Sequence, residues 1–297
     1  MTASSTSRRA KILVSTEELA GMLGDPSLRI FDCTVHLHAS ADNSTYRAEP
    51  GRADYDAGHI PGSAFLDLQV DLCDSAKLPI KFVVPTADAF AAGAGRLGIG
   101  EGTRVVLYDR TRNQWAARVW WMLRMFGFDD VRVLDGGMVK WAKEGRPVAR
   151  EATRYPAARF IARPRSGMIV SKEEVLTAVE TRQPGLTVLN ALTSEQHRGA
   201  GGVHYGRPGR IPGSACVAAR AIIDPETQAY LPDEQLRAMF AAAGALEADR
   251  VIAYCGGGIA ASSAALALTF LGQDNVAIYT NSLQEWALDP NLPMEVG

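Results

Sequence analysis

An internal duplication limits the possible folds more than any other feature of the 297-residue sequence. Three motifs occur twice in the same order: Ile60–Ser63 and Ile211–Ser214, Val105–Asp109 and Val251–Cys255, and Trp141 and Trp286. The offset is 255 − 109 = 146 residues for one pair and 286 − 141 = 145 for another. Because order and offset are both kept, we infer two tandem copies of one domain.

The seam between the copies lies near Glu144–Gly167, which holds three prolines and several arginines. Such a stretch without periodicity is typical of a linker. We therefore expect an N-terminal domain over residues 1–150 and a C-terminal domain over residues 165–297. Each is long enough to bury a core of its own.

Within each copy, short apolar runs alternate with helical patterns, which favours a parallel sheet between helices. The predicted fold class is α/β, with two tandem doubly wound domains. Strands are expected at Arg29–Cys33, Ala64–Leu66, Arg104–Tyr108, Val131–Leu134, Leu186–Asn190, Ala215–Val217, Arg250–Tyr254 and Asn275–Tyr279. Helices are expected at Thr86–Leu97, Gln114–Met125, Lys172–Glu180, Asp233–Ala243 and Ile259–Leu271.

Composition excludes several classes of protein. The net charge of −2 argues against nucleic-acid and membrane partners. No apolar run approaches the roughly 18–20 residues needed to cross a bilayer. Met1–Lys11 is polar and lacks the apolar stretch of a secretory signal, so we expect a short disordered tail and a cytoplasmic location.

Four cysteines, Cys33, Cys73, Cys216 and Cys255, lie far apart and form no CxxC pair. This spacing is not typical of a metal site or a dense disulfide framework, and it favours free thiols in a reducing compartment. We expect neither metal nor cofactor, and three of the four thiols should fill core positions.

Cys255 is the candidate nucleophile, because it separates a predicted strand from a predicted helix. The loop after it is Gly256, Gly257, Gly258, Ile259 and Ala260. Ligands of open α/β sheets bind where strands end, and a helix begins with unpaired N–H groups and a positive dipole end. Glycines let successive N–H groups converge as an anion nest, which favours a thiolate and would hold a persulfide anion.

Two other interpretations of this loop remain. In the first, Cys255 is a buried structural residue before a glycine-rich turn and has no catalytic role. A phosphatase loop would place arginine at position 261, but Ala261 stands there. Without a guanidinium, a phosphate dianion lacks its bidentate partner. The glycines of residues 199–209 lack the spacing of a dinucleotide loop, so we expect a flexible loop near the mouth of the site.

Several motifs together resemble the thiosulfate/3-mercaptopyruvate sulfurtransferase family, which has two rhodanese domains in tandem. They are Tyr55–Ser63, Leu134–Gly137 with Trp141, Glu144–Val148, Glu195–Gly199, Ile211–Ser214, the Cys255 loop and Leu283–Trp286. The resemblance implies that the second domain carries sulfur as a Cys255 persulfide. The first domain would be inactive, since Asp109 stands at its cysteine position.

The resemblance also implies the reaction. Sulfur would pass from 3-mercaptopyruvate or thiosulfate to a thiol, thioredoxin or cyanide, without a cofactor. The uncharged loop is similar to that of members that prefer 3-mercaptopyruvate, although Gly257 stands where they have a serine or threonine.

Three residues are candidates for substrate binding by this resemblance. Arg198 matches one of two arginines that hold the substrate carboxylate, and His59 matches a family histidine at the domain interface. The second arginine falls on Leu192, next to Asn190, where the family has aspartate. Arg210 stands where the first copy has His59 and could supply the missing charge. These departures keep a second hypothesis open, a non-catalytic tandem module that binds a regulatory partner.

Overall fold

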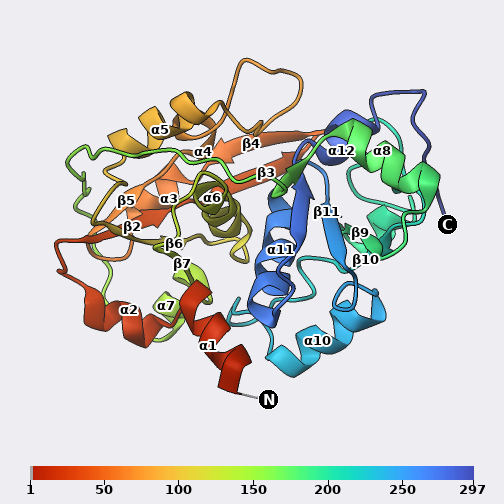
Figure 1. Cartoon of the computed structure of the whole chain (residues 1–297). Helices are drawn as coiled ribbons and strands as arrows, with labels where there is room; N and C mark the ends of the chain where they lie inside the picture. Colours follow the sequence, from red (N-terminus) through yellow and green to blue (C-terminus); the bar gives the residue numbers. More distant parts are fainter. Residues whose placement is uncertain (1–2) are drawn as a thin grey trace.

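Each half of the chain folds around a five-stranded parallel sheet in the computed structural model, which describes residues 3–297 (Figure 1). The first sheet has the order β1 (Leu13–Val14), β7 (Val131–Leu134), β6 (Arg104–Tyr108), β2 (Leu28–Asp32), β5 (Ser63–Phe65). The second has the order β10 (Ala215–Cys216), β9 (Leu186–Asn190), β11 (Arg250–Tyr254), β12 (Val276–Tyr279), β8 (Ile169–Val170). Corresponding strands occupy corresponding places, so the predicted duplication and fold class are confirmed.

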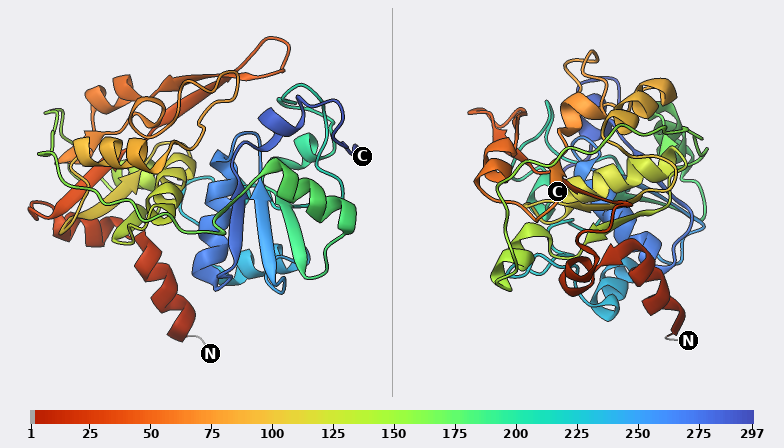
Figure 2. Two further views of the ribbon diagram at one scale, coloured as in Figure 1. Left: turned by 45° about the horizontal axis from the view of Figure 1, so that its top comes forward. Right: turned by 90° about the vertical axis from the view of Figure 1, so that its left-hand side faces the viewer.

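Helices flank both sheets (Figure 2), because strands of parallel sheets are apolar on both faces. In the first domain they are α2 (Thr16–Met22), α3 (Arg52–Ala57), α4 (Leu68–Asp71), α5 (Ala87–Arg96), α6 (Gln114–Met125) and α7 (Gly137–Lys143). In the second they are α8 (Lys172–Thr181), α9 (Ser194–His197), α10 (Asp233–Ala242), α11 (Ile259–Leu271) and α12 (Ser282–Trp286). Among the described helices, none has the length and apolar character to cross a membrane.

The two domains join through α6 and α11, which lie side by side between the sheets (Figure 1). Helix α11 is apolar almost all round, and a helix of that kind is buried on every side. One cluster of buried apolar side chains therefore runs through both domains. The site at the start of α11 is thus packed against the first domain.

The repeated Ile-Pro-Gly-Ser motif binds a buried tyrosine in each domain. The Tyr108 hydroxyl lies 2.9 Å from Ser63 Oγ, and the Tyr254 hydroxyl lies 2.7 Å from Ser214 Oγ. In the second domain the same hydroxyl accepts a hydrogen bond from the main-chain N of Ile211. Tyr108 and Tyr254 immediately precede Asp109 and Cys255, so this motif fixes the end of the strand that leads into each loop.

An antiparallel hairpin, β3 (Val35–Ala39) and β4 (Tyr46–Pro50), was not predicted. It leaves the first domain and extends over the second (Figures 1 and 2). At its tip, the main-chain oxygen of Asn43 accepts a hydrogen bond from His204 N, at 3.0 Å. The hairpin therefore covers the carboxyl edge of the second sheet.

The disordered tail predicted for Met1–Lys11 is wrong for residues 3–11, which lie in helix α1 (Ala3–Ile12), while its first two residues lie outside the described residues. Arg8 pairs with Asp274 at 2.7 Å, and Arg9 pairs with Asp233 at 2.6 Å. Arg9 also reaches the main-chain oxygens of Tyr230 and Leu231. Both acidic partners belong to the second domain, more than 220 residues away along the sequence, so the local pattern held no sign of them.

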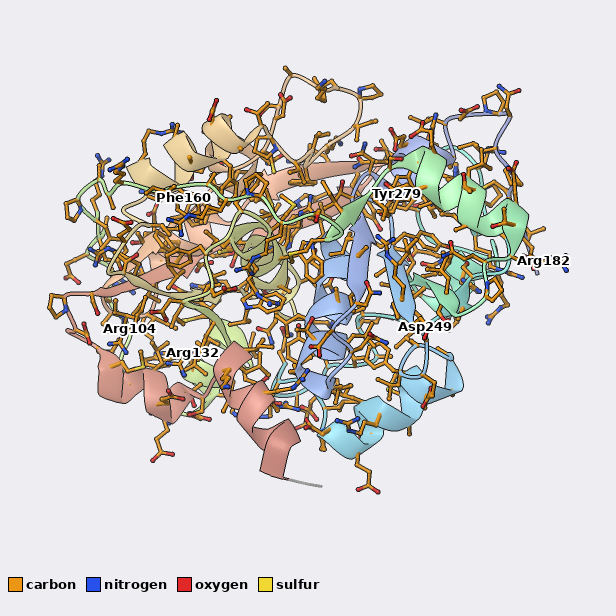
Figure 3. All side chains as sticks on the ribbon, viewed as in Figure 1. Arg104, Arg132, Phe160, Arg182, Asp249 and Tyr279 are labelled. Carbon is orange, nitrogen blue, oxygen red and sulfur yellow. The ribbon has the colours of Figure 1, made fainter. Side chains whose placement is uncertain are left out.

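The connecting segment packs along the first domain. The main-chain N of Ala158 donates to Gly95 O at 2.9 Å. Phe160, which lies over the first domain in Figure 3, meets Phe90 edge to face, with 5.6 Å between ring centroids. The linker is therefore part of the first domain's surface.

Candidate active site

Cys255 lies directly after β11, at the N-terminal end of α11, and its side chain is only 2% exposed. Its sulfur accepts a hydrogen bond from the main-chain N–H of Gly258 at 3.1 Å. Its own main-chain N donates to Ser282 Oγ at 3.0 Å. The positive end of a 13-residue helix and an inward N–H group both favour negative charge on the sulfur.

Each loop glycine lies close to a neighbour that a side chain at its position would meet. A Cβ at Gly256 would overlap the Tyr205 hydroxyl. Gly258 has a left-handed φ of +81°, and a Cβ there would lie 2.7 Å from Thr280 O. A Cβ at Gly257 would lie 2.8 Å from Nε2 of Gln284. The loop therefore packs closely against the side chains of Tyr205 and Gln284 and the main chain of Thr280.

In the first domain, the corresponding loop surrounds the carboxylate of Asp109. Asp109 is 1% exposed, and its carboxylate accepts four main-chain hydrogen bonds of 2.7–3.0 Å. The donors are the N–H groups of Thr111, Asn113, Trp115 and Ala116. Burial raises the pKa of Asp109, and these N–H groups oppose that effect. The duplicated loop is thus built to surround a negative group.

A cavity of about 440 Å³ opens at Cys255 and lies between the domains. Aromatic side chains from both domains form much of its wall: Tyr46, Phe82, Trp115 and Tyr205. Phe82 and Trp115 contact each other, as do Tyr46 and Tyr205, with ring centroids 5.1 Å and 5.9 Å apart. The volume is ample for a small sulfur compound and falls in the range of organic ligand sites.

Charged side chains in the described lining are all basic. They are Lys81, Arg112 and Arg220, and no acidic residue is part of this described lining. His36 and His38 also line the cavity, and each lies beside a carboxylate, that of Asp54 or Glu49. Arg220 lies 3.7 Å from the carboxylate of Glu195, and both side chains are largely exposed. A cavity with this balance of charge favours an anionic ligand.

The predicted substrate-binding residues lie outside this cavity. His59 is completely buried in the first domain, where its ring nitrogens lie 2.8 Å from Tyr55 O and 3.1 Å from Glu151 O. Arg198 is exposed at the end of α9. Arg210 pairs with Glu295. The structure therefore brings none of the three to Cys255.

Leu192 and Asn190, the two residues at the end of β9 that differ from the family pattern, have different surroundings. Leu192 is 9% exposed and lines the cavity. Asn190 is buried, and its Oδ1 accepts the main-chain N–H of Leu192 at 2.9 Å. Its Nδ2 lies 3.1 Å from Nδ1 of His197. Burial and the nearby Arg210 charge lower the pKa of His197 to about 4. At neutral pH the ring is therefore neutral, and its Nδ1 accepts a hydrogen bond from the Asn190 amide.

Comparison with known proteins identifies the chain. The rhodanese-like domain family matches residues 15–144 and 190–289. The chain belongs to the rhodanese family. Human 3-mercaptopyruvate sulfurtransferase is 32% identical over 93% of the chain and 92% of its own length. Bovine thiosulfate sulfurtransferase is 33% identical with the same coverage. Escherichia coli SseA, a 3-mercaptopyruvate sulfurtransferase of known structure, has 26% identity and a TM-score of 0.79, covering 91% of this chain and 98% of that one.

These relatives make the chain a sulfurtransferase of the tandem-rhodanese type, and the resemblance inferred from its motifs is confirmed. Relatives named for either donor are almost equally similar to it. Overall similarity therefore does not decide which donor this rhodanese uses. The choice between donors has to be argued from the geometry of the site.

Sequence reasoning missed most of the cavity wall. Tyr46 lies on the hairpin that was not predicted, and Tyr205 lies in the glycine-rich stretch that was expected to be a flexible loop. Burial raises the pKa of both tyrosines, so their hydroxyls remain protonated at neutral pH. The overlap of Tyr205 with any side chain at Gly256 is a contact that only the folded chain reveals.

The Gln284 side chain occupies the space beside Gly257 in this rhodanese. Its side-chain amide accepts from Lys81 N at 3.0 Å and donates to Lys81 O at 2.7 Å, which ties α12 to the first domain. We predict that Gly257→Ser lowers the free energy of unfolding by about 1–2 kcal/mol, because the new side chain displaces this amide.

Urea denaturation of three variants checks this prediction. Gln284→Ala should destabilise by a similar amount, and adding Gly257→Ser to it should change little, because the displaced group is already absent. Fully additive losses would show that Gly257 is required for another reason.

Proposed function

We propose that Cys255 receives sulfur from a small donor, stores it as a persulfide and passes it to a thiol or cyanide. The observation that carries this proposal is the Cys255 sulfur, hydrogen-bonded to a loop N–H at 3.1 Å, at the base of a basic cavity of about 440 Å³. A preorganised N–H donor at the positive end of a helix stabilises an anion on the sulfur. The Asp109 loop of residues 1–150 supports it as an inactive copy of the loop in residues 165–297.

In the first half-reaction, the Cys255 thiolate attacks the outer sulfur of the donor. With 3-mercaptopyruvate, the carbon–sulfur bond breaks, the thiol proton ends on the carbon, and pyruvate leaves. With thiosulfate, the sulfur–sulfur bond breaks and sulfite leaves with the electron pair. Either route leaves Cys255 as a persulfide anion.

In the second half-reaction, an acceptor thiolate attacks the outer sulfur of the persulfide and restores the Cys255 thiolate. A small thiol or an exposed thiol of thioredoxin would become a persulfide, and cyanide would become thiocyanate. A donor and an acceptor that use one cavity in turn give ping-pong kinetics. This chemistry needs a reducing compartment, and we place it in the cytoplasm.

The donor's charge is held by the cavity rather than by the three residues named from the sequence. His59 and Arg210 are bound within their own domains, whereas Arg112 and Arg220 face the cavity. The loop itself carries no charge beside the sulfur. This arrangement suits 3-mercaptopyruvate, whose carboxylate lies away from its sulfur, better than thiosulfate, whose charge is adjacent.

Steady-state transfer to a small thiol tests the proposal. We expect kcat/KM for 3-mercaptopyruvate to exceed that for thiosulfate by about tenfold or more, a difference of about 1.4 kcal/mol. A clear preference for thiosulfate would contradict the donor assignment. No transfer from either donor to any acceptor would favour a non-catalytic module.

A further inference from the structure

Arg118 is a buried cation that forms no ion pair within the described residues 3–297. It lies on α6 of the first domain and is 0% exposed. Its Nη2 donates to Phe82 O at 3.0 Å, while Nε and Nη1 have no hydrogen-bond partner within the described residues. An uncompensated buried guanidinium is destabilising, so its presence in the core requires a physical reason.

The free side of this guanidinium faces the Cys255 loop. Nη1 lies 3.1 Å from the point that a Cβ of Gly258 would occupy. Gly258 is the residue whose N–H donates to the Cys255 sulfur. Helices α6 and α11 pack together and hold the two groups in place across the domain interface.

One other thiol lies near Arg118 but does not neutralise it. Burial raises the pKa of Cys73 to about 12, even though Arg118 opposes that rise. Cys73 is therefore a neutral thiol at physiological pH. Burial also lowers the pKa of Arg118 itself, an effect that negative charge on Cys73 or on Cys255 would counteract. Because Cys73 stays neutral, Cys255 is the thiol that can supply this charge.

We infer that Arg118 is the buried counter-charge of Cys255, and that it stabilises first the thiolate and then the persulfide anion from beneath the loop. This inference rests on the proposed function. It assigns the first domain a direct electrostatic part in sulfur transfer. Arg118 acts through the charge on the sulfur and does not line the cavity, so it is a positioning residue and leaves the donor's binding site unchanged.

Other titratable groups that face the sulfur do not replace this charge. Tyr46 and Tyr205 lie close enough to interact with a charged Cys255, and burial raises the pKa of each. The remaining titratable groups are those of the cavity lining: His36, His38, Lys81, Arg112 and Arg220. They lie on the solvent-accessible side, where water screens their effect. Removal of the buried guanidinium should therefore alter the charge on the Cys255 sulfur more than removal of any of these groups.

The rate of Cys255 alkylation by iodoacetamide, followed against pH by peptide mass mapping, tests the inference. In Arg118→Met, which keeps length but not charge, we expect the midpoint of the profile to rise by about 1–2 units. Alkylation at neutral pH should slow about tenfold or more. Arg118→Lys should restore much of the wild-type profile.

Arg124→Met is the matched control. Arg124 lies on the same helix, but its guanidinium pairs with Asp129 at 3.4 Å and lies over Trp120, 4.8 Å from the ring centroid. Its removal should leave the midpoint unchanged. A wild-type profile in Arg118→Met, or an equal shift in the Met and Lys variants, would overturn the inference.

A measurement on the unmodified chain covers the case in which Arg118→Met does not fold. The ¹⁵N resonances of the Arg118 guanidinium should shift when 3-mercaptopyruvate loads Cys255 with sulfur, and those of Arg124 should not. An unchanged Arg118 signal with sulfur bound would overturn the inference alone. If wild-type protein takes no sulfur from any donor, the proposed function fails, while the alkylation profile still decides whether Arg118 favours the thiolate.

Discussion

Cys255→Ser should lower sulfur transfer from either donor by about 10³-fold or more, as expected when the sole nucleophile is removed. A serine fits the same space and keeps the main-chain contact of residue 255 with Ser282. Its hydroxyl stays protonated at neutral pH and cannot store sulfur. The loss should therefore appear in kcat, without a change in the midpoint of urea denaturation.

Cys216→Ser provides the matched control for this variant. Cys216 is also in the second domain and is partly exposed, but it ends β10 and lies outside the cavity lining. We expect its replacement to change transfer by about twofold or less, the usual effect of a substitution away from the chemistry. A Cys255→Ser protein that kept a tenth of the wild-type rate would contradict the assigned role.

Asp109→Ala should lower the free energy of unfolding by about 2–4 kcal/mol, although the residue takes no part in the chemistry. Four main-chain N–H groups donate to its carboxylate, and alanine would leave all of them buried without a partner. Asp109→Asn should have a smaller effect, because the amide keeps one of the two accepting oxygens.

Guanidinium denaturation followed by tryptophan fluorescence measures both variants of Asp109. The Asn variant should fall between wild type and the Ala variant. If alanine changed the free energy of unfolding by less than about 0.5 kcal/mol, the loop would not depend on an anion at its centre, and its analogy to the Cys255 loop would fail.

The sequence predicts those parts of the fold that depend on local pattern. Strand β6 and helix α6 begin and end at the predicted residues. Each is marked by a local sequence pattern, a short apolar run for the strand and a helical period for the helix. The β3–β4 hairpin escaped prediction because most of its side chains are not buried, so it carries no clear apolar alternation.

Long-range pairing limited the prediction of the site. Cys255 and its glycines could be found because strand, nucleophile and helix are contiguous. Arg210 could not be placed, because its partner Glu295 is 85 residues away along the chain. Arg118 was hidden for the same reason, since its helix and the Cys255 loop meet only when the two domains pack.

Mass spectrometry of the chain after incubation with 3-mercaptopyruvate, and separately with thiosulfate, tests the central claim most directly. We predict a gain of one sulfur atom per chain, located on the peptide that contains Cys255, removed by a reductant and absent from Cys255→Ser. A chain that gains no sulfur from either donor, or gains it on another cysteine, would contradict the account.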